Sequence, residues 1–170
     1  GSVTLDGEVT SCAGISIQSG NNPAANRRIF GTAYASLQTT STLHSIDLLA
    51  GDTAGSIILN STGISATQIF VTAPAGSVQH GPGGLITADL LQVRSHSGVM
   101  ARTAVTRIDA EVAGQGDITV RSLNDVTLQL LTAGGQITVF VAGNIHAENV
   151  IVTGSAPSDA ISLIAQSPQI

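Results

Sequence analysis

Two acidic side chains in the stretch "RIDAEVAG", residues 107–114, have the spacing that carbohydrate-cleaving enzymes require. If this stretch is a β-strand, alternation places Arg107, Asp109 and Glu111 on its outer face. The inward set would then be Ile108, Ala110 and Val112. Carboxylates two residues apart on one strand lie within about 7 Å of each other, inside the range of a glycosidase pair. Arg94, about one repeat earlier, would join them.

The expected surroundings of this pair favour a simpler interpretation. A polysaccharide lyase with a stacked-strand fold needs acidic residues on several adjacent turns to hold Ca²⁺. The expected neighbours here are Gln92 and Thr127, and neither is acidic. A solvated charge cluster is therefore the preferred interpretation, and a carbohydrate-active protein using Asp109 and Glu111 is the alternative.

The histidines and the cysteine predict no metal site, no cofactor and no disulfide. No two histidines are two or four residues apart, so they do not form a ligand pair on one element. They are His44, His80, His96 and His146. Cys12 is the only cysteine, which rules out an internal disulfide, and we expect its thiol to be buried and inert.

The composition restricts the class of protein. The 170 residues are 42% hydrophobic, 10% charged and 2% aromatic, which favours many short strands joined by turns over solvated helices. All six basic residues are Arg, and the net charge of −5 argues against nucleic-acid binding. No run of about 18 apolar residues is present, so no membrane span is expected.

The elements that would position the carboxylates repeat along the chain. One series of glycine-led or small-residue-led triplets starts at 55, 76, 98, 116, 135 and 159, with intervals of 18 to 24 residues. Its members are "GSIIL", "GSVQH", "GVMAR", "GDITV", "GQITV" and "DAISL". A second series comprises "QIFV", "LLQV", "RIDAEV", "DVTLQL" and "NVIV", and "GISA", "GLITA" and "GNIHA" fall between the two.

Three strand-like segments in a period of about 20 residues predict a right-handed parallel β-helix of about seven coils, with three strands per coil. Side chains would stack on their equivalents one coil away, about 4.8 Å apart. One inward stack would be Ile57, Val78, Ile118, Ile137 and Ile161; the other would be Ile69, Leu91, Ile108, Val126 and Val150. Thr119, Thr138 and Ser162 would lie side by side on the outside.

The stretch 18–45 breaks the period. We interpret it as an enlarged corner loop that leaves the coil after "GISI" at 14 and returns near Leu37 or Leu43, with a short helix over 23–35 as one option. Loops that interrupt a solenoid often bind its partner. The candidate binding residues here are Arg27, Arg28, Phe30 and Tyr34.

The pieces "AGQGDITVRSLNDVTLQL", "AGGQITVFVAGNIHAENVIV" and "APSDAISLIAQ" resemble the degenerate β-helical repeats of filamentous-haemagglutinin-like and giant bacterial surface proteins. The resemblance covers about 40 residues well and about 120 loosely. It implies an exported stalk or adhesin segment with no catalytic motif. The chain departs from this pattern at 18–45 and 98–106.

The sequence therefore predicts a single domain over 1–170 that is a structural or adhesive segment of a larger exported protein, extracellular or at the cell surface, and not an enzyme. No cap is recognisable at either end, so the expected partners are neighbouring coils of the same polypeptide or a copy stacked end to end. A surface glycan or protein is a further option. A binding module acting through the 18–45 loop is the third interpretation.

Overall fold

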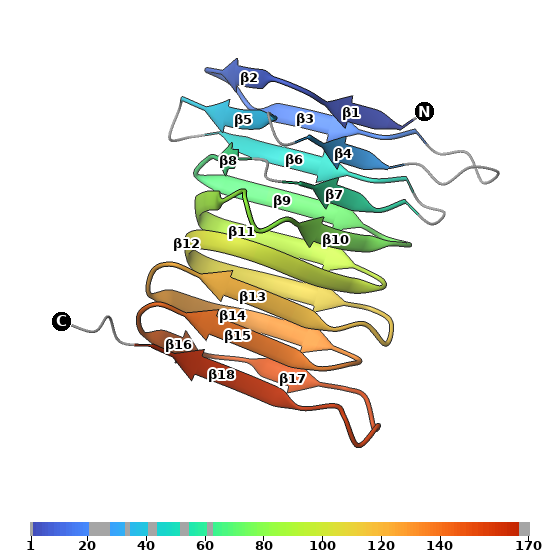
Figure 1. The fold of residues 1–170 in the computed structure, drawn as a ribbon, viewed down its shortest axis with the longest axis vertical. Helices are drawn as coiled ribbons and strands as arrows, with labels where there is room; N and C mark the ends of the chain where they lie inside the picture. Colours follow the sequence, from blue (N-terminus) through green and yellow to red (C-terminus); the bar gives the residue numbers. More distant parts are fainter. Residues whose placement is uncertain are drawn as a thin grey trace.

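The computed structural model describes residues 2–20, 28–32, 35–40, 44–51, 55–60 and 63–166. Within these ranges the regular elements are all β-strands, and every pair of neighbouring strands is parallel. The strands stack one coil on the next from β1–β3 at one end to β16–β18 at the other (Figure 1). The predicted parallel β-helix is confirmed.

Three walls run along the coil, and each is a parallel sheet. Wall A consists of β1 (Val3–Leu5), β4 (Ile29–Gly31), β7 (Ile57–Leu59), β10 (Ser77–His80), the first part of β12 (Gly98–Val112), β13 (Ile118–Ser122), β15 (Ile137–Val141) and β18 (Ile161–Ala165). The register from Val3 to Ile161 makes about six to seven turns, close to the expected seven.

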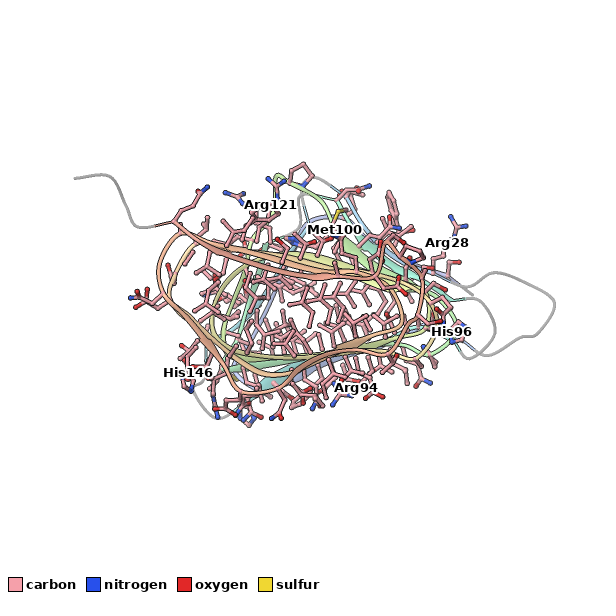
Figure 2. The ribbon with its side chains drawn as sticks, turned by 90° about the horizontal axis from the view of Figure 1, so that it is seen from below. Arg28, Arg94, His96, Met100, Arg121 and His146 are labelled. Atoms are coloured by element: carbon pink, nitrogen blue, oxygen red, sulfur yellow. The ribbon has the colours of Figure 1, made fainter. Side chains whose placement is uncertain are left out.

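The other two walls complete each turn. Wall B consists of β2 (Glu8–Ser11), β5 (Ser36–Thr39), β8 (Gly63–Ser65), the first parts of β11 (Ile86–Ser95) and β14 (Val126–Ala133), and β16 (Ile145–Ala147). Wall C consists of β3 (Ile15–Gln18), β6 (Ser45–Leu49), β9 (Gln68–Ala73), the later parts of β11, β12 and β14, and β17 (Val150–Val152). Walls A and C form opposite long sides of a flattened cross-section, as the labels Met100 and Arg94 indicate (Figure 2).

The inward stack on wall A is confirmed and gains one member. In register it reads Ile57, Val78, Val99, Ile118, Ile137 and Ile161. Val99 was missing from the sequence-based stack because the triplets were aligned on their glycines, whereas the sheet pairs Gly98 with Ser77 and Val99 with Ile118. Ile118 is fully buried, so each such side chain fills the space between two equivalents.

The second expected stack is wrong after its third member. Ile69, Leu91 and Ile108 are in register, but the next partner of Ile108 is Leu128. A bulge follows at once, because Asp109 pairs with Leu130 and Gln129 is the extra residue. Val126 pairs with Ile145 on wall B, and Val150 pairs with Leu131. A repeat read from apolar residues alone could not locate a one-residue insertion.

The corners are held by side chains that reach the backbone of the next coil. Asp117 Oδ1 accepts the Gln136 N–H at 2.7 Å, and Asp125 Oδ1 accepts the Asn144 N–H at 2.8 Å. The backbone hydrogen bond from Asn144, followed by its side-chain hydrogen bond, lowers the pKa of Asp125. Gly98 adopts φ +142°, a backbone conformation that favours glycine. Outside wall A, Thr119, Thr138 and Ser162 are adjacent as expected.

The loop expected at 18–45 is largely part of the coil. β4 pairs with β1 and β7, and β5 pairs with β2 and β8, so the chain is back in register by Ile29, earlier than the expected return near Leu37 or Leu43. A helix over 23–35 is also wrong at Ile29–Gly31, which is strand. Residues 21–27 and 33–34 lie outside the described part. Polar composition hid the short strands from the sequence pattern.

Two further findings concern single residues and spans. Cys12 is exposed, so the expectation of a buried thiol is wrong; it lies in the outermost N-terminal coil, where nothing covers the turn after β2 among the described residues. Within the described ranges, no helix is both long and apolar enough to span a membrane.

Candidate functional site

The carboxylates predicted from "RIDAEVAG" lie together on the outer face of wall C. Asp109 and Glu111 both belong to β12, whose alternate residues Ile108, Ala110 and Val112 are buried as expected. On the preceding coil, β11 places Gln92 opposite Asp109 and Arg94 opposite Glu111. The parallel register therefore brings one guanidinium to two carboxylates.

The geometry is that of a closed ion-pair cluster. Arg94 Nη1 and Nη2 donate to Asp109 Oδ1 and Oδ2 at 2.9 and 3.0 Å, which is the bidentate arrangement. Arg94 Nε lies 3.3 Å from Glu111 Oε2. Gln92 Nε2 donates to Asp109 Oδ2 at 2.8 Å. The side chain of Asp109 is only 19% exposed, so these contacts satisfy most of what water would otherwise provide.

The protonation state of Asp109 follows from the same contacts. Burial raises its pKa, but the hydrogen bonds from Arg94 and Gln92 and the charge of Arg94 outweigh burial, so the pKa falls below its ordinary value. Asp109 is thus ionised at neutral pH and unable to donate a proton there. The acid of a glycosidase needs the opposite shift.

The neighbours on the next coil differ from those expected. Thr127 lies opposite Arg107, and the bulge brings Leu130 opposite Asp109. Glu111 faces Thr132. The described residues form no cluster of three or more His, Cys, Asp and Glu side chains that could hold a metal ion. Of the histidines, His80 is buried, whereas His44, His96 and His146 are exposed at separate places.

The candidate binding residues of the 18–45 stretch are only partly described. Phe30 points outward from β4 between Thr4 and Ile58 and is half-buried. Arg28 is exposed, and its backbone N–H donates to Ser2 Oγ at 3.2 Å. Arg27 and Tyr34 lie outside the described residues. The predicted binding role of this stretch stays a prediction.

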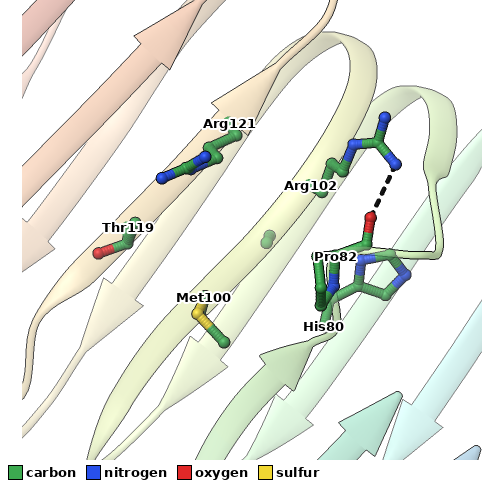
Figure 3. A pocket seen from close by; sticks show the side chains of 7 residues that line it. His80, Pro82, Met100, Arg102, Thr119 and Arg121 are labelled. Atoms are coloured by element: carbon green, nitrogen blue, oxygen red, sulfur yellow. Dashed lines mark hydrogen bonds between the residues drawn. The ribbon is translucent and has the colours of Figure 1, made fainter. Parts of the chain in front are cut away.

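A different set of side chains forms a hollow that the sequence did not indicate. On the outer face of wall A, a groove of about 510 Å³ is lined by His80, Pro82, Met100, Arg102, Thr119 and Arg121 (Figure 3). We call it the arginine groove. Its volume is within the range of ligand pockets. Met100 in this lining is 46% exposed, a high value for a large apolar side chain.

The two arginines are direct neighbours on adjacent coils, since Arg102 of β12 pairs with Arg121 of β13. Each is held toward a different side. Arg102 Nη1 donates to the carbonyl oxygens of Pro82 and Gly84 at 2.9 and 3.4 Å. The guanidinium carbon of Arg121 lies 5.3 Å from the centre of the Phe140 ring, a cation–π contact. No carboxylate in the described part of the chain forms an ion pair with either of them.

One signal in the sequence could have found this groove. Arg102 and Arg121 are 19 residues apart, which is one coil. Aligning the triplets on Gly98 and Gly116 hid the match, because these glycines are offset by one residue in the sheet. Aligning the inward residues Val99 and Ile118 instead brings the two arginines into register.

Comparison with known proteins does not add to this description. No protein-family model matches the sequence, and neither the curated proteins nor the solved structures include a significant match.

Proposed function

We propose that this chain is a structural or adhesive β-solenoid segment of a large exported bacterial surface protein, without catalytic activity. The export, the surface location and the adhesive role follow from the resemblance of residues 113–154 to bacterial surface repeats. The physical support is the state of the last coil, described next.

The apolar stack is uncovered at β18. Ile161 and Leu163 continue the inward columns of Ile137 and Val139, yet they are 46% and 37% exposed, whereas Ile137 and Val139 are fully buried. The four side chains are similar in type and in position on the strand. The difference arises because no further strand lies against β18 among the described residues. A further coil would remove this apolar surface from water, which is favourable.

The chain itself presents a matching surface at the opposite end. Val3 and Leu5 of β1 begin the wall A columns that Ile161 and Leu163 end. A second copy placed with its β1 against β18 would continue both columns with the same strand direction. Such head-to-tail contact does not close on itself and extends into a filament. The occupant we propose for the β18 face is therefore the first coil of another copy.

Concentration-dependent association tests this proposal. Sedimentation velocity of the wild type should show species larger than the monomer that increase with concentration. Leu163→Glu should abolish them, because a carboxylate at the contact would be buried without a partner. Met100→Glu is the matched control, since it places the same charge at an exposed apolar position on the side of wall A. Circular dichroism should show the β-structure retained in both variants.

Two results would overturn the end-to-end role. One is a wild type that stays monomeric as its concentration rises. The other is an association that Met100→Glu disrupts as strongly as Leu163→Glu, which would place the contact on the side of the coil.

The carbohydrate-active alternative has one observation in its favour, the joint outward position of Asp109 and Glu111. Two features weigh against it: both carboxylates are engaged by Arg94, and the pKa of Asp109 is lowered. Loss of polysaccharide cleavage or binding in Asp109→Asn and Glu111→Gln variants would favour the alternative over the structural role.

A further inference from the structure

We propose that the arginine groove is a binding site for a small organic oxyanion, either a carboxylate or a phosphate monoester. The oxyanion would lie between Arg102 and Arg121, and its apolar body would lie over Met100 and Pro82. This site is independent of the end-to-end contact, because it lies on the side of wall A (Figure 2).

The first argument is the placement of like charges. Two cationic side chains directly opposite each other on neighbouring strands repel, and such pairs are destabilising. Here the guanidiniums of Arg102 and Arg121 are kept toward opposite neighbours, Pro82 on the preceding coil and Phe140 on the following one. An anion between them would turn this repulsion into two attractive contacts.

The second argument is the donor capacity that remains. A guanidinium has five N–H donors in a fixed plane that matches carboxylate and phosphate oxygens. The described contacts of Arg102 use only Nη1, and Arg121 presents its face to Phe140, which leaves its edge for hydrogen bonds. The nearest acid on the same wall, Asp117, already accepts the Gln136 N–H.

The third argument concerns the apolar part of the ligand. Met100 and Pro82 supply apolar surface next to the cations, and Thr119 adds a hydroxyl that can donate or accept. A flexible Met side chain adapts to ligands of irregular shape. A volume of about 510 Å³ accommodates a body about the size of one ring.

The charge of the whole chain makes the groove distinctive. With six basic and eleven acidic residues, the net charge of −5 repels anions in general. The affinity for an anion therefore has to come from local geometry, so a matched variant elsewhere can test it.

The test uses the whole chain and three probes: benzoate, phenyl phosphate and inorganic phosphate. Chemical-shift titration at low ionic strength should give saturable binding of benzoate or phenyl phosphate, with a dissociation constant of about 1–10 mM or below. The ranking of these two distinguishes a carboxylate from a phosphate ligand. Inorganic phosphate should bind more weakly than phenyl phosphate because it has no body to contact Met100.

Variants locate the site. Arg121→Gln should weaken binding by about tenfold or more, since it removes one charge-assisted pair. Met100→Glu should abolish binding by placing a carboxylate within the groove. Arg107→Gln is the control, because Arg107 is an exposed guanidinium on wall C with no ion pair in the described structure.

The outcomes are separable. Loss of binding in Arg121→Gln with retention in Arg107→Gln supports the site. Equal weakening in both variants, or no saturable binding of any probe, would overturn it. Inorganic phosphate binding as tightly as phenyl phosphate would overturn the contact with Met100 and Pro82. None of these results depends on whether the chain associates end to end.

Discussion

Walls A and C each place an arginine directly opposite a charged residue on the adjacent coil, but the signs differ. On wall C, Arg94 lies opposite Glu111 and also binds Asp109. On wall A, Arg102 lies opposite Arg121. The backbone relation is the same in both cases, because each pair occupies neighbouring positions of a parallel sheet.

The difference shows what decides whether a charged position becomes structure or site. On wall C the opposite charges satisfy each other, so the cluster is closed and links two coils. On wall A the like charges turn outward to a carbonyl group and an aromatic ring, and a groove is left between them. Register is fixed by the core in both walls, so the sign of the facing residue sets the outcome.

The largest expected effect comes from the core that fixes this register. Ile118→Asp should prevent folding, because Ile118 is fully buried between Val99 and Ile137, and an unpaired charge there costs several kcal/mol. Loss of the cooperative thermal transition in circular dichroism is the measurement. A cooperative β-type transition in this variant would mean that the wall A stack is wrongly assigned.

The adjacent residue provides the control for that variant. Thr119→Asp introduces the same carboxylate one position along β13, where the side chain faces outward. We expect its transition to stay cooperative. Because Thr119 lines the arginine groove, this variant should also lose anion binding.

The second largest effect concerns the cluster on wall C. Arg94→Gln should lower the free energy of unfolding by about 1 kcal/mol, since it leaves Asp109 and Glu111 close together without their cation. The figure is small because Arg94 is 34% exposed and water replaces part of the interaction. Urea denaturation measures it, with Arg107→Gln from the same wall as the control. A control shift as large as that of Arg94→Gln would show that the ion pairs contribute nothing specific.

The cluster also predicts a dependence of stability on pH. The pKa of Asp109 is lower in the folded state, so its contribution is present above the unfolded pKa of about 3.9 and is lost as the pH falls through the folded value. The stability difference between wild type and Arg94→Gln should therefore be constant near neutral pH and shrink below about pH 4. Urea midpoints from pH 2 to 7 measure it. A difference that grows toward acid pH would have the wrong sign.

The comparison also indicates what the sequence could predict. The wall A stack followed from Ile57, Ile118 and Ile137, because side-chain alternation and a coil of about 20 residues determine which residues face inward. The outward position of Asp109 and Glu111 followed from the same alternation. Both depend only on the period of the strand and on burial.

What the sequence could not predict depends on single-residue offsets and on short strands. The bulge after Ile108 exchanged Thr127 for Leu130 opposite Asp109, and the offset between Gly98 and Gly116 concealed the pairing of Arg102 with Arg121. Strand β4 was missed because a three-residue strand between polar stretches has no visible alternation. A one-residue slip changes which face every later side chain occupies, so such errors affect sites before they affect the fold.

The smallest expected effect completes the comparison of the two walls. Arg121→Gln removes one guanidinium, as Arg94→Gln does, but from a pair of like charges. The lost cation–π contact with Phe140 and the relieved repulsion with Arg102 oppose each other, so the free energy of unfolding should change by less than about 0.5 kcal/mol. A double-mutant cycle with Arg102→Gln isolates the repulsion, and we expect a coupling that makes each substitution less favourable once the other is present. The measurement is urea denaturation at low salt, where exposed charges are least screened. A loss of stability equal to that of Arg94→Gln would mean that wall A also uses its arginines to hold coils together, and the contrast between a closed cluster and an open groove would fail.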